Sequence, residues 1–305
     1  MPLDHLVPEF YLKFFGNEIG QVSVKTIEGL KKVNTRSALV TENFYSNAIE
    51  KFDFEANLQI TESQVAPIMK NIVSNNQRAL SKLDYSKLFE FICSAYLRSY
   101  RSRNLTANMI EIMVRTEFVE VKHRLSGHIS VKHREGLDQY DIVVGDFQHS
   151  DPMNKTDSLM KNLHFQSYKM VLSRVKEEVQ NYELHIVEFT RKRLITCDSP
   201  TVLFSDSGQV SSLVTAEQIY FPLSPRLALF YTRREANSSK KEWFASTVLQ
   251  ELFNDAIARN ARYGLVSHPD DYALIGPQEI NSNVEELEIS RVIDQINRSG
   301  NSETQ

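Results

Sequence analysis

Cysteine is scarce in this chain of 305 residues, which contains only Cys93 and Cys197. Two cysteines are too few for a disulfide framework, and these two are not spaced as metal ligands are. Both lie in apolar stretches, where a free thiol behaves as a small hydrophobic side chain. We therefore predict neither a disulfide scaffold nor a metal site built on cysteine.

Long apolar runs are also missing. Nowhere do about 18 apolar residues follow one another, which is the length that a membrane-spanning helix needs. No basic segment followed by an apolar stretch opens the sequence, as it would in a secretory signal. The sequence therefore predicts a soluble, cytoplasmic protein with no membrane partner.

Charge of one sign does not dominate, because 35 Lys and Arg stand against 39 Asp and Glu, and the formal net charge is −4. This balance excludes a broad positive field that would hold a nucleic acid along a track. Short basic clusters at 98–103, 191–193 and 233–234 could still bind single phosphates. Phosphate-binding glycine loops, nucleophile elbows and zinc-binding patterns are absent, which disfavours the common nucleotide hydrolases and serine hydrolases.

Aromatic residues are plentiful, with 17 Phe and 12 Tyr in a chain that is 41% hydrophobic. That composition is typical of a globular protein, and the length suits one large domain or two small ones. Residues 4–15, DHLVPEFYLKFF, place Pro8 at a helix start with aromatic pairs at i,i+4 spacing behind it. We expect this segment to dock firmly and to anchor His5 against the core.

Helical patterns dominate the first half of the chain. Two short strands are expected at 21–27 and 36–40, before a helical region over 60–124. The first of these helices must begin later than Thr61 or bend at Pro67, because proline deep in a helix costs about 3 kcal/mol. Residues 125–155 then indicate a connection or a small β insertion.

An amphipathic helix at 157–181 precedes a second half rich in strands. Five short apolar or alternating runs lie between residues 184 and 232, and a helix at 243–261 and a strand at 264–268 follow them. The pattern predicts an α+β fold, in which a helical N-terminal half packs with a mixed or antiparallel sheet from the C-terminal half. We expect one domain over 1–275 and a polar tail over 276–305, whose short amphipathic helix could support self-association.

Two opposite charges fall on inward-facing helical stripes. Arg98 follows Leu88, Phe91 and Ala95 at helical spacing, and Glu62 stands in the same relation to the apolar residues after it. These charges either form a buried ion pair that sets helix register or belong to a ligand site, where perturbed charges also gather. Both interpretations stay open at this stage.

Asp198 and His5 are equally ambiguous. Asp198 closes an apolar strand before Ser199 and Pro200, so it either caps a turn or presents a carboxylate at a sheet edge. His5 could make a docking hydrogen bond, act as general acid or base, or bind a metal. His123, His128 and His133 are spaced by five, which keeps one face on neither a helix nor a strand, and we assign them no metal.

Several phrases resemble those of a known family. HLVPEFYLKFF near the start is similar to the family phrase H-x-V-P-x-x-Y-L-x-x-F, and ITCDSP at 195–200 is similar to ITSDNP. PLSP at 222–225 and LFNDAIARNARYGLVS at 252–267 follow in the family's order. Over residues 4–268 the chain thus resembles the family catalogued as domain of unknown function 4238.

The resemblance implies particular positions. A glutamate and an arginine of the family look like Glu62 and Arg98 here, and an asparagine of the late helix looks like Asn254. The chain departs from the family at Ser199, where the family has asparagine, and over 125–155, which has no counterpart. The family's activity is not established, so the resemblance implies a fold and positions but neither a substrate nor a cofactor.

The polar residues together suggest hydrolysis of a phosphate-bearing substrate, such as a nucleic acid or nucleotide. The hypothesis assigns three catalytic and three substrate-binding residues: His5, Glu62 and Asp198, and Arg98, Arg101 and Asn254. The alternative is a non-catalytic binding or sensor module, in which the same charges form a structural network. A nucleic-acid binder without chemistry is a third interpretation, which the net charge disfavours.

Overall fold

The structure is a computed structural model. It describes residues 3–42, 44, 54–99, 101–102, 119–123, 128–133, 139–143, 168, 171–190, 193–204, 213, 216–234 and 247–280. The chain divides into two compact units, the first comprising 1–44, 55–101 and 168–281 and the second 45–54, 102–167 and 282–305.

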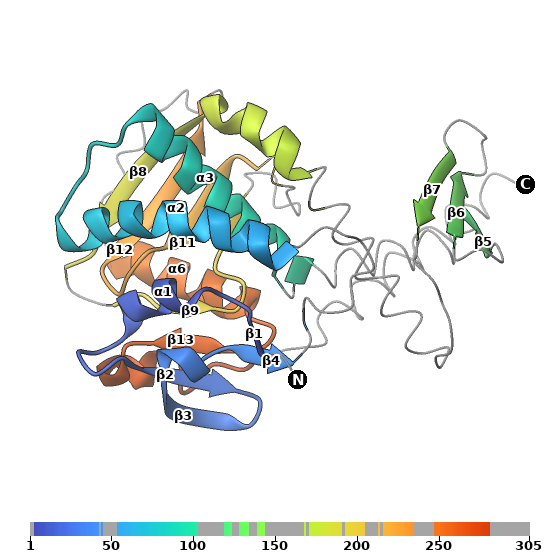
Figure 1. Cartoon of the computed structure of the whole chain (residues 1–305). Helices are drawn as coiled ribbons and strands as arrows, with labels where there is room; N and C mark the ends of the chain where they lie inside the picture. The colour runs from blue at the N-terminus through green and yellow to red at the C-terminus, as the bar shows by residue number, and fades with distance from the viewer. Residues whose placement is uncertain are drawn as a thin grey trace, which may run out of the picture. The chain divides into compact units, whose positions relative to one another are not determined.

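The first unit contains a four-stranded antiparallel sheet in the order β10-β11-β12-β8 (Figure 1). Its strands are β8 (Tyr182–Glu188), β10 (Val202–Phe204), β11 (Gln218–Pro222) and β12 (Leu227–Arg233). All lie within the five runs expected between residues 184 and 232, apart from the first residues of β8 and the last of β12, and the remaining run, at 194–197, supplies β9 (Thr196–Cys197). Of the two sheet types that were expected, mixed or antiparallel, this sheet is antiparallel.

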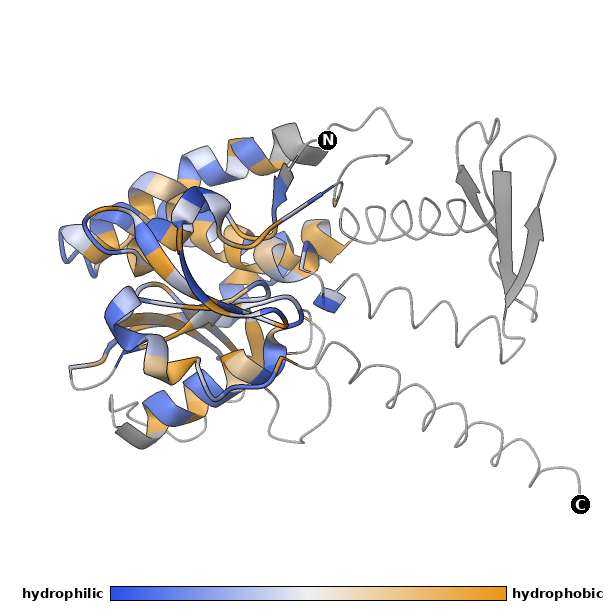
Figure 2. Ribbon diagram, turned by 90° about the horizontal axis from the view of Figure 1, so that it is seen from below, coloured by the Kyte–Doolittle hydropathy of each residue, from blue (hydrophilic) through white to orange (hydrophobic). Residues whose placement is uncertain are grey.

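Helices cover both faces of that sheet. The helices of the first unit are α1 (Glu9–Leu12), α2 (Phe54–Ser74), α3 (Lys82–Leu97) and α6 (Thr247–Asn260), with a further helical stretch at 171–178. The ring of Phe89 on α3 lies 5.1 Å from that of Tyr231, and the ring of Phe253 on α6 stacks at 3.9 Å on Tyr220. Aromatic side chains therefore pack between helix and sheet on both faces of the sheet, and Figure 2 colours the residues of these helices and strands by hydropathy.

A second four-stranded sheet has the order β3-β2-β13-β9. Its further strands are β2 (Gln21–Thr26), β3 (Gly29–Asn34) and β13 (Leu265–Ser267), and the short strands β1 (Leu3–His5) and β4 (Val40–Glu42) pair separately. The expected strand at 36–40 was wrong for residues 36–39, because residues 36–37 belong to the 3-10 turn Thr35–Ser37 and the strand β4 begins only at Val40. Gly29 has φ +127°, a conformation that glycine adopts without strain, so β2 turns back at once into β3.

The N-terminal segment docks as expected. Tyr11 is fully buried, and its hydroxyl lies 2.7 Å from Thr196 Oγ1 and donates at 2.6 Å to the carbonyl of Pro222. The ring of Tyr11 also lies 5.5 Å from that of Phe15, which is one of the predicted i,i+4 pairs. Tyr11 of α1 is therefore hydrogen-bonded to both four-stranded sheets, to β9 through Thr196 and to β11 through Pro222.

Helix α2 rules out one of the two alternatives considered for Pro67, a helix that begins after Thr61. It begins at Phe54, ahead of Thr61, and runs through Pro67 to Ser74. Pro67 lies on the exposed side of the helix, where water can satisfy the carbonyl that loses its partner. The apolar stripe is as predicted, since Val65 is fully buried on the opposite side together with Met69 and Ile72.

The described part of the second unit is a three-stranded antiparallel sheet in the order β5-β6-β7. Its strands are β5 (Val119–His123), β6 (His128–His133) and β7 (Gln139–Val143). The small β insertion expected over 125–155 is therefore confirmed in part. The helical assignment was wrong for residues 119–123, which form its first strand.

The fold is α+β, as predicted, but strands also occur in the N-terminal region, so helices and strands are not divided between the two halves of the chain. The part of the chain that the structure describes also contains four 3-10 segments: η1 (Lys13–Phe15), η2 (Thr35–Ser37), η3 (Val179–Asn181) and η4 (Pro269–Leu274). Within the described ranges, every helix is too short or too polar to cross a membrane. Residues 281–305, which hold the predicted amphipathic tail helix, lie outside the described residues.

Candidate functional site

The pairing of Glu62 with Arg98 is present. Arg98 caps the C-terminal end of α3, and its Nη1 donates to Glu62 Oε1 across 2.6 Å. The guanidinium is almost completely buried, with 2% of the side chain exposed, and it lies 5.9 Å from the centroid of the Phe91 ring. Glu62 keeps 24% of its side chain exposed. The ion pair therefore has a buried cation and an accessible carboxylate.

Arg101 lies three residues beyond Arg98 in the sequence and is half-buried. Its Nη1 donates at 2.5 Å to Oδ1 of Asn260, at the last position of α6. The amide of Asn260 donates in turn to the carbonyls of Ser199 and Thr201, the latter at 3.0 Å. Asn260 thereby connects the chain after α3, the loop between β9 and β10, and α6.

Asp198 is completely buried, and both of its oxygens are occupied. Oδ1 accepts backbone N–H groups from Arg262, Tyr263 and Gly264, at 3.0, 2.9 and 2.9 Å. Oδ2 accepts the hydroxyl of Ser199 at 3.0 Å. The carboxylate therefore fastens the turn between α6 and β13 to the end of β9, a long-range form of the turn-capping role considered above.

Burial raises the pKa of Asp198, and the three backbone N–H groups and the Ser199 hydroxyl lower it part of the way back. Ser199, where the family phrase has asparagine, makes one of these hydrogen bonds with its hydroxyl. A Cβ on Gly264 would lie 2.8 Å from Leu39 Cδ2 and 3.2 Å from the carbonyl of Lys25, so this close approach requires glycine.

His5 is half-buried on β1. Its Nε2 lies 3.1 Å from the carbonyl oxygen of Arg36, and because a carbonyl only accepts, Nε2 carries the proton. This hydrogen bond corresponds to the docking contact, one of the three roles considered for His5.

Two further residues lie between the predicted site residues. The first is Phe91, whose ring lies 5.8 Å from that of Phe10, five positions after His5 in the chain, and also faces Arg98. The second is Tyr263, whose N–H donates to Asp198 and whose hydroxyl donates at 3.0 Å to the carbonyl of Val40, the register partner of His5. Only Glu62 and Arg98 contact each other directly among the predicted residues whose contacts are described.

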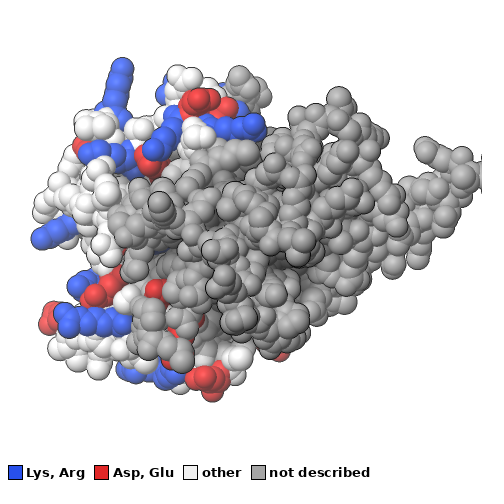
Figure 3. Space-filling view, turned by 45° about the vertical axis from the view of Figure 1, so that its right-hand side comes forward, with Lys and Arg blue, Asp and Glu red and all other residues white. Residues whose placement is uncertain are grey.

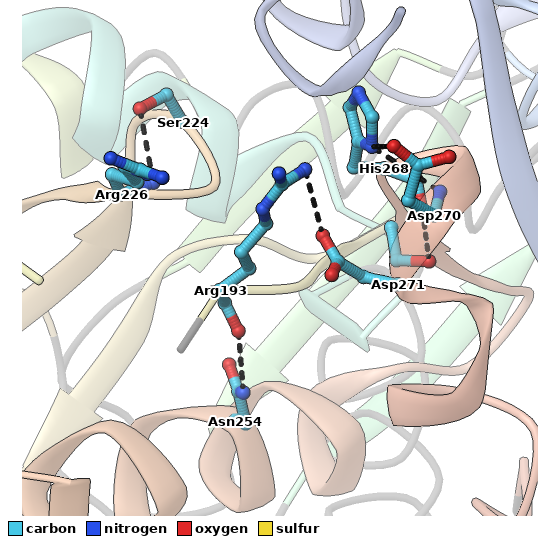
Figure 4. A network of polar contacts seen from close by, with 8 residues as sticks. Arg193, Ser224, Arg226, Asn254, His268, Asp270 and Asp271 are labelled. Atoms are coloured by element: carbon cyan, nitrogen blue, oxygen red, sulfur yellow. Dashed lines mark hydrogen bonds and ion pairs between the residues drawn. The ribbon is translucent and has the colours of Figure 1, made fainter. Parts of the chain in front are cut away.

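Asn254 lies on another part of α6, where its side chain hydrogen-bonds to the backbone (Figure 4). Its Oδ1 accepts the N–H of Ile195 at 3.0 Å, and its Nδ2 donates at 3.1 Å to the carbonyl of Arg193. The Arg193 side chain reaches Asp271 at 3.3 Å. The amide of Asn254 thus holds the segment before β9 against α6, with both of its polar ends in use.

Asn260 was missed by the sequence reasoning, although a signal for it was present. Phe253 and Ile257 define the buried stripe of α6, and Asn260 follows at seven and three residues from them, on the same face. The structure leaves only 3% of Asn260 exposed. A polar residue at such a position needs hydrogen-bond partners, and its two carbonyl acceptors and Arg101 provide them.

The electrostatics of the described surface are mixed. In Figure 3, lysine and arginine side chains alternate with aspartate and glutamate rather than forming one basic patch. Among the described residues no three acidic, histidine or cysteine side chains gather as metal ligands would. The register of β5 and β6 places His123 opposite Ile129 and His133 opposite Val119, at the two ends of the strand pair.

Comparison with known proteins gives a family and nothing more specific. No curated protein and no solved structure matches the chain. A family model described as "Protein of unknown function (DUF4238)" matches residues 4–271, which include both four-stranded sheets of the first unit and all six predicted site residues. The order of the four phrases and this match agree, and the chain therefore belongs to the DUF4238 family.

Proposed function

We propose that this protein binds a phosphate-bearing ligand beside the C-terminal end of α3 and hydrolyses a phosphoester bond in it. The observation that carries the proposal is the accessible carboxylate of Glu62, which Arg98 holds, with a second arginine, Arg101, three residues further along the chain. Arginine presents a planar fork of donors that matches phosphate oxygens. A carboxylate next to such a fork can activate the attacking water.

The three residues have different accessibility, and this separates their roles. Arg98 is too buried to meet a ligand, so its role is to position Glu62 through the 2.6 Å contact. Arg101 is half-buried and uses Nη1 for Asn260, which leaves its other N–H groups for phosphate oxygens. Asn260 fixes the orientation of that guanidinium.

The reaction requires one proton acceptor and one anion clamp. Glu62 takes a proton from a water molecule, whose oxygen bonds to phosphorus while the bond from phosphorus to the ester oxygen breaks. The departing oxygen is protonated by Glu62 or by solvent. Arg101 stabilises the negative charge on the phosphoryl oxygens, which is greatest in the transition state.

The test uses three probes: 4-nitrophenyl phosphate, bis(4-nitrophenyl) phosphate and a fluorescent single-stranded oligonucleotide, each with and without EDTA. Loss of a general base typically lowers the rate about 10²- to 10⁴-fold, so Glu62→Gln should lose at least 10²-fold in kcat, roughly the lower limit. Arg101→Met should raise KM. Arg226→Met, which changes an exposed arginine on another loop, is the matched control.

Absence of hydrolysis with all three probes would refute the hydrolytic proposal, and so would full activity in Glu62→Gln. The competing function is a non-catalytic binding module. The other two predicted catalytic residues favour it, because their side chains bind the protein itself. Both oxygens of Asp198 accept hydrogen bonds from the protein, and His5 contacts the Arg36 carbonyl. Phosphate-dependent binding that Arg101→Met abolishes, without turnover, would establish that alternative.

A further inference from the structure

Strand β8 forms an outer edge of the sheet β10-β11-β12-β8. It pairs with β12 over all seven residues, from Tyr182 opposite Arg233 to Glu188 opposite Leu227, without a break in register. The opposite edge, β10, has only three residues. Proteins usually shorten, bulge or cover such edges because an exposed edge templates pairing with another chain. Within the described residues, no strand pairs with the outer side of β8.

The direction of the backbone groups follows from the bonds at both ends of β8. The N–H of Phe189 donates to the carbonyl of Arg226, and the carbonyl of Asn181 accepts the N–H of Arg234, both at 2.8 Å. Odd-numbered residues therefore face β12, and since successive residues alternate in direction, even-numbered residues present N–H and C=O groups outward.

One of the outward groups is already bound. The carbonyl of Tyr182 accepts the hydroxyl of Tyr85 at 2.7 Å and lies 3.4 Å from Arg234 Nε. Tyr85 thus closes the N-terminal end of the edge. Leu184, Ile186 and Glu188 remain as the positions at which an added strand can pair.

A groove of about 580 Å³ runs along this edge, within the size range of ligand sites. Strand β8 lines the groove with Tyr182, Glu183, Leu184, Ile186 and Glu188. Arg78 and Leu80 of the α2–α3 connection, Tyr85 of α3 and Arg234, directly after β12, complete the lining. Half-buried Leu184 and Ile186 occupy its centre. Ionic groups lie at its ends, where Arg78 contacts Glu188 at 3.1 Å and Arg234 lies by Tyr182.

We propose that this edge accepts an extended peptide of a protein partner as an additional strand. The pairing positions from Leu184 to Glu188 span five residues, about 17 Å of strand at the usual rise. Two arginines and two glutamates line the groove, so it is neutral and does not favour a polyanion such as a nucleic acid. Its apolar centre selects an uncharged segment with β-branched or aromatic side chains at alternate positions.

The probe is a phage-displayed library of random heptapeptides, selected on the full chain and followed by synthesis of the enriched sequences. Affinity is measured by fluorescence anisotropy for the parent, Ile186→Pro and Ile186→Thr. Proline removes the outward N–H but none of the bonds to β12, and edge strands tolerate it there. Threonine keeps both the N–H and a β-branched side chain, so it is the matched control.

We expect the enriched peptides to carry apolar residues at alternate positions. They should bind Ile186→Pro about tenfold more weakly than the parent, because one or two hydrogen bonds are lost. Ile186→Thr should stay within about threefold of the parent, which is below the effect of one such bond. On the parent itself, bound peptide should slow amide hydrogen exchange at Leu184 and Ile186, whereas His185, which faces β12, should not change. This readout holds even where the proline variant fails to fold.

Three outcomes would overturn the proposal. Failure to enrich any peptide would do so, as would peptides that leave exchange at Leu184 and Ile186 unchanged. A parent that forms dimers in solution, with monomers only in Ile186→Pro, would show that a second copy of the chain occupies the edge instead. None of these results depends on phosphoester hydrolysis, so the two proposals stand or fall separately.

Discussion

Asp198→Ala tests whether this carboxylate belongs to the fold or to a reaction. The substitution removes the acceptor of three backbone N–H groups and of the Ser199 hydroxyl, all in a fully buried site. Each buried donor left without an acceptor costs about 1–3 kcal/mol. Relief from burying a charge offsets part of this sum. We therefore expect the free energy of unfolding to fall by about 3–5 kcal/mol, in the range of a broken buried charge network.

The assay is urea denaturation followed by circular dichroism, with thermal melting as a second reading. At this chain size the expected loss corresponds to a decrease in Tm of about 10 °C, from roughly 2–4 °C per kcal/mol. Asp255→Ala, on the exposed side of α6, is the matched control and should change stability by less than about 0.5 kcal/mol. Equal stability of the two variants would refute the reasoning and return Asp198 to the list of catalytic candidates.

Three further predictions concern the same framework. Asn260→Ala should lower the free energy of unfolding by about 2–3 kcal/mol, because two buried carbonyls lose their donor; denaturation in urea measures it. Tyr11→Phe should lower it by about 1–2 kcal/mol, since the hydroxyl joins Thr196 and Pro222; an unchanged Tm would contradict this. Burial raises the pKa of Asp198 above its ordinary 3.8, so the native state holds that proton more tightly than the unfolded state does. Unfolding measured against pH should show the parent gaining stability relative to Asp198→Asn as pH falls through the raised pKa, with no further gain below 3.8.

Periodicity predicted most of the elements and the inward direction of the key charges. The strands between residues 184 and 232 were recognisable because each is a short apolar run between polar turns, and Val65 and Arg98 lie on the stripes that helical spacing assigned to them. Residues 119–123 were assigned to a helix because nothing local separates an isolated alternating stretch from a helical one. Only pairing with β6 makes it a strand.

The roles of the site residues were harder to predict, because each depends on contacts between distant parts of the chain. The carboxylate of Asp198 accepts hydrogen bonds from backbone N–H groups more than sixty positions away, and nothing in the local sequence ITCDSP predicts these partners. The same holds for Asn254, whose amide binds the backbone of residues 193–195. Spacing shows that a polar residue is buried, whereas only the fold shows whether its hydrogen bonds are already made.

The phrases that identify the family are neighbours in space, and this bears on where function lies. Tyr11, from the first phrase, binds Thr196 of the second and Pro222 of the third. Asp198, from the second, binds the backbone of the fourth at Arg262 and its two successors. The four phrases are therefore linked by hydrogen bonds that hold both sheets and α6 together.

Polar groups that are already hydrogen-bonded within the protein stabilise the fold and are not available to a ligand. Chemistry requires a polar group that the fold positions but does not consume, and Glu62 and Arg101 meet that condition through Arg98 and Asn260. If this reasoning holds, substitutions within the phrases will act mainly on stability, and substitutions of Glu62 or Arg101 will act mainly on ligand binding and turnover. A variant set that reverses this division would show that the phrases themselves carry the activity.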